Sequence, residues 1–320
     1  MAHRRDRICR GCRSRSRVRP ALEPRHDHRR WQTPPRHRLT KSRTVADYPL
    51  TTPRKTTPAE EARLAQARRQ FQERKRIADS LKSIGKRIGV YSGKGGVGKT
   101  TVAVNLAATL AKQDRDVALF DCDIDCPNVT RVLRISEGPV ERDGRMVPSQ
   151  RFGVKVMSMA FFQQNEEEAI IWRGPMIHNA INQFLQMTDW GEPDYMVVDL
   201  PPGTSDAPLT VMQTLNLDGF VIVSTPQELA ALDAKRSINM IRKMNLDVLG
   251  VVENMTGGLF GEVAAEELAY EMGIPFLGAV NLRPDYLDAL EPPVLTNEDV
   301  AAEFDYIALG VTRQLVGNRA

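Results

Sequence analysis

The chain of 320 residues is poor in cysteine, in aromatic side chains and in long apolar runs. Cysteine occurs 4 times, and aromatic residues make up 6% of the sequence. Four cysteines do not suggest a disulfide framework, so we expect a reducing compartment and predict a cytoplasmic protein. No apolar run approaches the roughly 18 residues that a membrane span needs, so we predict no membrane partner. The length allows one large domain or two small ones.

Acidic residues are scarce in one segment only. Residues 1–56 hold 17 Lys and Arg against 4 Asp and Glu, a net charge of +13, whereas residues 57–320 hold 27 against 36, a net charge of −9. The first segment has almost no apolar clustering, so it cannot bury enough surface to fold by itself. Its Cys9 and Cys12 have the spacing of half a metal site, which no second pair completes. We therefore predict a basic, disordered leader ahead of an acidic body.

Three interpretations of this leader remain open. A run such as Arg13–Arg17 would neutralise phosphates in a nucleic-acid-binding arm. An Arg-rich, acid-poor start is also typical of an organelle transit peptide. On composition we favour a misassigned translation start, because no Met lies between Met1 and Met146, which leaves room for a non-Met start codon such as that of Val45. We expect nucleic acid as a partner only if the leader is genuine.

A glycine-rich segment fits the phosphate-binding pattern G-x-x-x-x-G-K-[ST]; it reads Gly93-Lys94-Gly95-Gly96-Val97-Gly98-Lys99-Thr100-Thr101. An apolar stretch at 88–91 precedes it as a short buried strand, and residues 101–111 follow with helical periodicity. A glycine loop between a strand and a helix start directs backbone N–H groups and the positive end of the helix dipole at one point, which suits a polyphosphate. Lys99 would reach the β- and γ-phosphates, and Thr100 would hold Mg²⁺. The sequence therefore predicts a nucleotide-binding P-loop.

From Lys86 onward, short apolar segments alternate with helical ones. Apolar strands separated by helices indicate a doubly wound, mostly parallel α/β sheet. We predict a leader at 1–56, an amphipathic N-terminal helix within 57–85 that runs from Pro58 to Ile84, and a P-loop domain at 86–320. The predicted strands are 87–91, 117–121, 154–159, 195–199, 220–224, 248–252 and 276–279; the predicted helices of the domain are 100–112, 175–187, 207–215, 229–243, 263–272 and 299–316.

Acidic residues close two of the predicted strands. Asp121 and Asp123 come at the end of the 117–121 strand, and Asp199 ends the 195–199 strand. Ligands of a doubly wound sheet bind beyond the carboxyl ends of the strands, and a carboxylate that ends an apolar strand needs a cation, water or hydrogen-bond donors. We therefore expect these carboxylates to face the P-loop. Gly203, which follows two prolines, can bring its N–H to a γ-phosphate, so we predict a switch segment at 199–206.

A second lysine in the P-loop narrows the class of protein. Lys94 directly follows the first glycine, where it resembles the signature lysine of the deviant P-loop ATPases, the group of MinD, ParA, the nitrogenase iron protein and the Mrp/ApbC carriers. The chain resembles most closely the Mrp/ApbC family of iron–sulfur cluster carrier ATPases, over roughly residues 60–318. This resemblance rests on five segments: Ser92–Thr101, Ile171–Met176, Asp194–Asp206, Val251–Met255 and Ile274–Gly278.

The resemblance implies ATP binding, slow Mg²⁺-dependent ATP hydrolysis, a homodimer, and transfer of iron–sulfur clusters to apoprotein clients. Lys94 would cross the dimer interface to the partner's nucleotide and neutralise charge as the γ-phosphoryl group leaves. Asp123 would orient or activate the attacking water, with Asp121 beside it near Mg²⁺, and Asp199 would hold Mg²⁺ through water. Asn254 matches the position that contacts adenine in this group. An ordinary turn asparagine explains that residue almost equally well.

One departure from the family concerns the thiolates. Members that carry a cluster usually place a Cys-x-x-Cys pair shortly after the Asn-Met that corresponds to Asn254–Met255, but this chain continues Thr256-Gly-Gly-Leu-Phe-Gly261. A bridging cluster needs thiolates from each subunit, so the Fe–S ligands stay unknown. We expect Cys122 to pack in the core and Cys126 to be accessible.

Two other functions therefore stay open beside an iron–sulfur cluster carrier. One is a MinD/ParA-like switch that binds membrane or DNA as a dimer. The acidic body argues against it, and so does the last helix, whose apolar stripe of Phe304, Ile307 and Val311 indicates core packing. The other is an Mrp-derived scaffold that keeps the nucleotide switch and holds no cluster.

Overall fold

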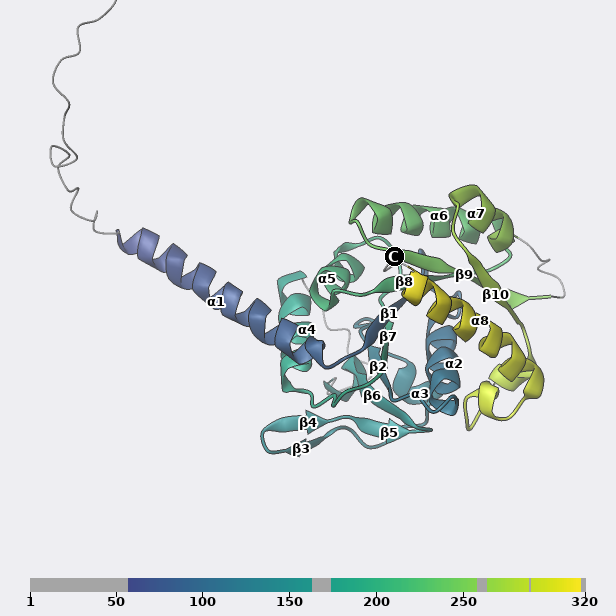
Figure 1. Cartoon of the computed structure of the whole chain (residues 1–320), viewed down its shortest axis with the longest axis horizontal. Helices are drawn as coiled ribbons and strands as arrows, with labels where there is room; N and C mark the ends of the chain where they lie inside the picture. Colours follow the sequence, from purple (N-terminus) through teal and green to yellow (C-terminus); the bar gives the residue numbers. More distant parts are fainter. Residues whose placement is uncertain (1–56, 163–173, 258–263, 288, 318–320) are drawn as a thin grey trace, which may run out of the picture. The chain divides into compact units, whose positions relative to one another are not determined.

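The computed structural model describes residues 57–162, 174–257, 264–287 and 289–317, and Figure 1 shows the arrangement of their elements. Within these residues, eight strands form one sheet in the order β10-β9-β8-β1-β7-β2-β6-β5. Neighbouring strands are parallel except β5 and β6, which are antiparallel. The predicted doubly wound, mostly parallel α/β fold is therefore confirmed. The strands are β1 (Lys86–Tyr91), β2 (Val117–Asp121), β5 (Ser149–Arg151), β6 (Val154–Ser158), β7 (Tyr195–Asp199), β8 (Gly219–Ser224), β9 (Val248–Thr256) and β10 (Phe276–Asn281).

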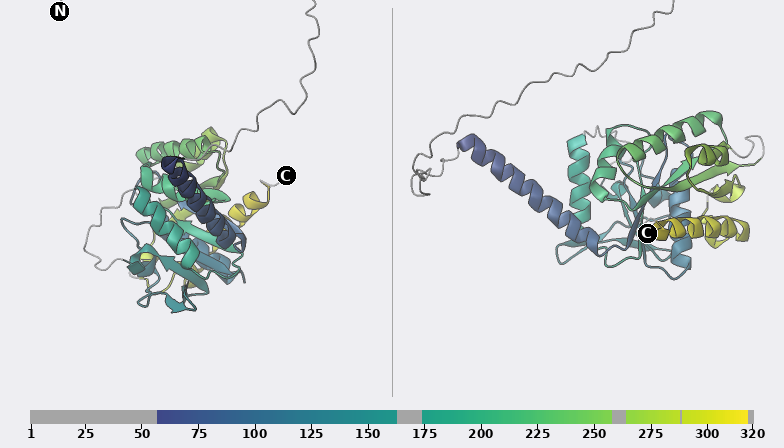
Figure 2. Two further views of the ribbon diagram at one scale, coloured as in Figure 1. Left: turned by 90° about the vertical axis from the view of Figure 1, so that its left-hand side faces the viewer. Right: turned by 45° about the horizontal axis from the view of Figure 1, so that its top comes forward.

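Helices cover both faces of this sheet (Figure 2). One apolar cluster joins α1, α4, α5, α6 and α7 to one face, and a second joins α2, α3 and α8 to the other. No helix in the described ranges is both long enough and apolar enough to cross a membrane. The helices are α1 (Pro58–Lys82), α2 (Lys99–Lys112), α3 (Val129–Val132), α4 (Gly174–Met187), α5 (Asp206–Leu215), α6 (Glu228–Lys243), α7 (Ala264–Met272) and α8 (Glu298–Gly317), with short 3-10 turns at Met159–Phe162, Pro284–Tyr286 and Pro293–Leu295.

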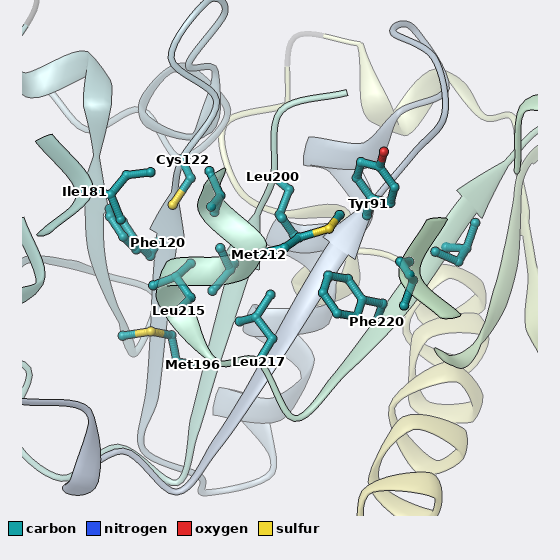
Figure 3. Packing of buried hydrophobic residues seen from close by; sticks show 14 of the residues in the cluster. Tyr91, Phe120, Cys122, Ile181, Met196, Leu200, Met212, Leu215, Leu217 and Phe220 are labelled. Atoms are coloured by element: carbon teal, nitrogen blue, oxygen red, sulfur yellow. The ribbon is translucent and has the colours of Figure 1, made fainter. Parts of the chain in front are cut away.

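The first apolar cluster fixes the central strands against α5. Figure 3 shows Phe120 of β2, Met196 of β7 and Phe220 of β8 in this cluster, together with Met212 and Leu215 of α5. These side chains are at most 1% exposed. Such close packing holds the strands in one register, so the loops that leave their carboxyl ends start from fixed positions.

A small hairpin was missed by the sequence analysis. Strands β3 (Val140–Arg142) and β4 (Arg145–Val147) pair antiparallel and form a separate two-stranded sheet. Asp143 and Gly144 join them with φ values of 54° and 75°, the left-handed backbone that two-residue hairpin turns need. Strand β5 was missed as well. These strands are three residues long and lack a buried apolar run, so hydrophobic periodicity does not reveal them.

The N-terminal helix α1 begins where the sequence predicts and ends two residues earlier. Thr57 and Glu60 form a capping box, in which the N–H of Thr57 donates to Oε2 of Glu60 at 2.7 Å. Only the last turns, with Ile77 and Leu81, pack into the first apolar cluster, and the described side chains ahead of Ile77 are exposed. Residues 57–320 form one compact unit, and the boundaries predicted at 56 and 85 stay predictions.

Candidate functional site

The predicted P-loop connects β1 to α2. Gly96 and Gly98 have φ of 79°, a left-handed conformation that favours glycine. A Cβ on Gly98 would lie 2.1 Å from Nδ2 of Asn254, which donates to the carbonyl oxygen of Val97 at 2.8 Å. The amino end of α2 has no side-chain cap in the described structure, so its N–H groups are available to an anion. Asn254 thus supports the loop, and its predicted contact with adenine stays a prediction.

Strand pairing brings the strand-end carboxylates together. Strands β2 and β7 are neighbours, and their register places Asp121 beside Asp199. Nζ of Lys99 lies 2.6 Å from Oδ1 of Asp199 and 3.6 Å from Oδ2 of Asp123. The hydroxyl of Thr100 donates to Oδ2 of Asp199 at 2.6 Å. The structure therefore gathers at one point the polar side chains that the sequence predicts for phosphate, metal and water.

Asp121 is fully buried, at 0% exposure. Its carboxylate accepts hydrogen bonds from the N–H groups of Asp123 at 3.1 Å and Val129 at 3.2 Å, and from the hydroxyl of Ser158 at 2.8 Å. Burial, and next the negative charge of Asp199, raises the pKa of Asp121 to about 8, although these hydrogen bonds oppose the rise. Sequence analysis missed Ser158, whose signal is a hydroxyl at the end of an apolar strand.

Lys99 is the cation that these carboxylates share. Burial lowers the pKa of Lys99, but Asp199 and Asp123 outweigh it, so the pKa rises and the ammonium group stays charged. Burial also raises the pKa of Asp123, against the charge of Lys99 and the N–H of Cys126, which donates to Oδ1 of Asp123 at 3.1 Å. One buried ammonium group therefore faces more carboxylate charge than it can neutralise.

This donor set fits Mg²⁺. Magnesium in nucleotide sites takes one or two protein carboxylates and completes its shell with phosphate oxygens and water. Thr100, Asp121 and Asp199 offer such oxygens beside the phosphate loop. The described ranges contain no group of three or more His, Cys, Asp or Glu that would hold a metal without a nucleotide. When bound, the ion would supply positive charge to the β- and γ-phosphate oxygens.

Lys94 lies at the other side of the loop, away from the carboxylates. Its Nζ donates to Oε1 of Gln227 at 3.3 Å. Both residues line a cavity of about 140 Å³ beside Thr225 and Met255. Sequence analysis did not single out Gln227, which follows β8 directly ahead of α6. The predicted crossing of Lys94 to a partner's nucleotide stays a prediction.

Two hydrogen bonds tie Gly203 of the predicted switch segment to the end of β1 and the residue after it. The N–H of Gly203 donates to the carbonyl oxygen of Ser92 at 3.0 Å, and the hydroxyl of Tyr91 donates to the carbonyl oxygen of Gly203. In the described conformation the carbonyl oxygen of Ser92 accepts from the Gly203 N–H, and the approach of this N–H to a γ-phosphate stays a prediction. Sequence analysis assigned Tyr91 only to a buried strand and missed this contact.

The thiols of the described body do not form a pair. Cys122 is fully buried in the first apolar cluster, and burial raises its pKa well above the ordinary value, whereas Cys126 is exposed. The expectations for both residues are confirmed. A cluster ligand must be an accessible thiolate, so Cys122 cannot serve without rearrangement of the core. Three other sequence features lie outside the described residues: the leader at 1–56 with Cys9 and Cys12, residues 171–173 of the Ile171–Met176 segment, and the loop at 258–263.

Comparison with known families and proteins identifies this architecture. Residues 83–311 match the model of a family described as ParA, a NUBPL iron-transfer P-loop NTPase. An iron–sulfur cluster carrier protein of Methanocaldococcus jannaschii is 36% identical over 264 residues, which are 78% of this chain and 91% of that protein. An iron–sulfur cluster transfer protein NUBPL of Dictyostelium discoideum is 40% identical over 265 residues, 77% of this chain and 81% of that protein.

Solved structures agree with this match. A nucleotide-binding protein of Archaeoglobus fulgidus, in complex with ADP, superimposes with a TM-score of 0.60 at 37% identity and covers 74% of this chain and 91% of that one. The cell division ATPase MinD of Pyrococcus furiosus superimposes with a TM-score of 0.57 at 22% identity and covers 72% of this chain and 99% of that one. The second likeness shows the shared fold alone.

Proposed function

This chain belongs to the NUBPL iron-transfer family of P-loop NTPases, the iron–sulfur cluster carriers, and from that membership we propose that it binds Mg²⁺–ATP and hydrolyses it slowly to drive iron–sulfur cluster transfer. The observation that carries the proposal is the contact of Lys99 with Asp199 and Asp123 directly behind the P-loop. A buried cation among carboxylates, under free helix N–H groups, suits a nucleotide triphosphate with its metal.

Each residue at the site has a role in this proposal. Lys99 binds the β- and γ-phosphates, and Thr100, Asp121 and Asp199 hold Mg²⁺. Asp123 orients the attacking water, because its carboxylate lies within reach of Lys99 and is held by the N–H of Cys126. The loop glycines cradle the phosphates through their N–H groups.

A homodimer completes the site. Lys94 belongs to the P-loop, and the amide oxygen of Gln227 is the one described acceptor of its ammonium group. A hydrogen bond of 3.3 Å between partly exposed side chains is weak, so the ammonium group is free to reach a second subunit. There it neutralises charge on the partner's γ-phosphate. Apoprotein clients that accept clusters are the further partners, and the cytoplasm is the proposed compartment.

A second candidate function follows from the thiols. No cysteine follows Cys126 in the sequence, so the position after Asn254 that carries the Cys-x-x-Cys pair in cluster-binding relatives has none. Cys126 is exposed and Cys122 is not. This arrangement favours an ATPase switch or scaffold that assists cluster assembly without holding the cluster itself.

Iron and acid-labile sulfide content separates the two functions. The protein for the test is the full chain with Cys9→Ser and Cys12→Ser, reconstituted anaerobically and compared with the same protein that also carries Cys126→Ser. Stoichiometric iron and sulfide that vanish with Cys126→Ser would establish a carrier whose ligand is Cys126. A colourless protein that still hydrolyses ATP would establish the scaffold. A protein that neither hydrolyses ATP nor binds ADP would contradict the proposed function as a whole.

A further inference from the structure

Tyr91 combines two environments in one side chain. It ends β1 at 0% exposure and belongs to the first apolar cluster. Figure 3 shows its ring beside this cluster and its hydroxyl directed away from the neighbouring apolar side chains. That hydroxyl donates to the carbonyl oxygen of Gly203. A tyrosine whose ring is held by packing presents its hydroxyl at a fixed position, with little freedom left to lose.

The Tyr91 contact is one of three that join the last two residues of β1 and the residue after it to the segment that follows β7. The N–H of Leu200 donates to the carbonyl oxygen of Val90 at 3.1 Å, and the N–H of Gly203 donates to that of Ser92 at 3.0 Å. Gly203 has φ of 85°, which favours glycine, so its two flanking peptides are free to turn without a Cβ clash. The hydrogen bonds with Tyr91 and Ser92 therefore hold both the N–H and the carbonyl group of Gly203, and any movement of the segment at this residue must break them.

The same hydroxyl also lies next to α6. Burial raises the pKa of Tyr91 to about 12, and the hydroxyl of Ser237 on α6 opposes part of this rise, so the group stays protonated and remains a donor at neutral pH. The backbone of Gly93 packs on this part of α6, because a Cβ there would lie 2.3 Å from the carbonyl oxygen of Asp233 and 2.8 Å from Oγ of Ser237. Tyr91 thus stands where the P-loop strand, the switch segment and α6 meet.

We propose that Tyr91 is a positioning residue that holds residues 199–206 in the described conformation and thereby sets how strongly the site prefers ATP over ADP. This inference rests on the proposed nucleotide site. For the N–H of Gly203 to reach a γ-phosphate it must leave Ser92, and the Tyr91 hydroxyl opposes that movement by holding the adjoining carbonyl. ADP has no γ-phosphate, so its binding does not require the movement. Binding that requires a minor conformation is weakened by the fraction of molecules that lack it.

The test replaces only the hydroxyl, with Tyr91→Phe in the full chain. Hydrogen exchange at 200–206, measured without nucleotide, is expected to become faster in the variant. Affinity for a non-hydrolysable ATP analogue is expected to rise about three- to tenfold, as the loss of one hydrogen bond permits, while affinity for ADP stays unchanged. The matched control is Tyr286→Phe, which removes a buried tyrosyl hydroxyl that has no hydrogen-bond partner among the described residues. Tyr286→Phe should change neither the hydrogen exchange at 200–206 nor the affinity for either nucleotide.

The outcomes separate this inference from the proposed function. Faster exchange together with a selective gain for the ATP analogue supports the role of Tyr91. Unchanged exchange, or equal shifts for the analogue and ADP, overturns it, because a residue that serves only packing would alter both nucleotides alike. If the unmodified chain binds neither nucleotide, the proposed function fails, and the preference assigned to Tyr91 fails with it. If the unmodified chain binds both the ATP analogue and ADP, the proposed nucleotide site stands, and the comparison of Tyr91→Phe with Tyr286→Phe then supports or overturns the role of Tyr91.

Discussion

Two regions at the carboxyl edge of the same sheet differ in how their charges are arranged. At the ends of β2 and β7, Asp121 and Asp199 are both 0% exposed, and Asp199 and Asp123 lie against one ammonium group, that of Lys99. At the ends of β9 and β10, Arg283 pairs with Glu303 at 2.7 Å and with Asp299 at 3.3 Å, and the Asp299 side chain is 76% exposed. In both regions one cation faces two carboxylates, but those of the first region are buried, whereas Asp299 in the second is open to solvent.

The difference indicates which region does chemistry. Excess buried charge costs stability and persists where a ligand is to be bound, because a metal ion or phosphate contact then relieves it. In the second region water can solvate the Asp299 carboxylate, so no ligand is needed to relieve its charge. In the second region the hydroxyl of Thr256 on β9 donates to Oδ1 of Asn281 on β10 at 3.1 Å, a contact between neighbouring strands. The contacts of the first region are those of a ligand site, whereas the described contacts of the second region support the fold.

The largest effect should come from Lys99→Ala. The ATP affinity should fall at least about 100-fold, because a charge-assisted contact of about 3 kcal/mol is lost. The protein without nucleotide should also lose roughly 3–5 kcal/mol of stability, since Asp199 would be left buried and unpaired. Calorimetry and urea unfolding measure the two quantities. Lys86→Ala, which removes a lysine 3.5 Å from Asp218 at the start of β1, is the control and should bind ATP normally. Undiminished ATP affinity in Lys99→Ala would contradict the site.

The next effect concerns turnover. Asp123→Asn keeps the size of the side chain and its acceptor for the N–H of Cys126, but it loses the negative charge that orients and activates water. We expect ATP affinity to change less than about threefold and hydrolysis to fall about 100-fold or more, in the range of acid–base catalysis. Single-turnover hydrolysis with a separate binding titration distinguishes the two. A loss of binding as large as the loss of turnover would show that Asp123 serves the loop and not the reaction.

A third prediction concerns pH. Asp121 has an ordinary pKa of 3.8 when unfolded and about 8 in the folded protein, so the folded form binds more protons between these values. Its contribution to the free energy of unfolding is therefore largest at low pH and is lost as the pH rises toward 8. In EDTA and without nucleotide, Asp121→Asn should flatten this decline and raise stability at pH 8, measured by urea unfolding at pH 5.5 and pH 8. Asp143→Asn, in the exposed hairpin turn, is the control and should keep the slope of the unmodified protein.

The P-loop and the carboxylates at the ends of β2 and β7 could be predicted from the sequence because their signals are local. The P-loop residues are contiguous, and Asp121 and Asp199 each end an apolar run. Helices between the strands indicate a parallel sheet, which places both carboxylates at one edge, whereas the pairing of β2 with β7 is seen only in the structure. The hairpin of β3 and β4 gave no such signal, since its short strands have no buried face.

Contacts between distant segments could not be predicted. The hydroxyl of Tyr91 meets Gly203, and the amide of Asn254 meets Val97, across more than a hundred residues of sequence. Nothing local to Tyr91 distinguishes it from a tyrosine that only fills a core, because its partner is a backbone carbonyl whose position depends on the whole sheet. Side chain to backbone contacts of this kind leave no pattern in a single sequence.

The smallest effect should come from Arg283→Ala in the second region, at the ends of β9 and β10. Its guanidinium donates to Oε1 of Glu303 at 2.7 Å, and the two side chains are 24% and 14% exposed, so water screens part of the attraction. The stability should fall by about 1 kcal/mol, the upper end for a partly exposed ion pair. Nucleotide affinity and turnover should stay unchanged. The hydrogen bonds that the structure describes for the Arg283 side chain go to Asp299 and Glu303, and none goes to the P-loop or to the switch segment. A marked loss of ATP hydrolysis in this variant would show that the two regions act together, and the contrast between them would then fail.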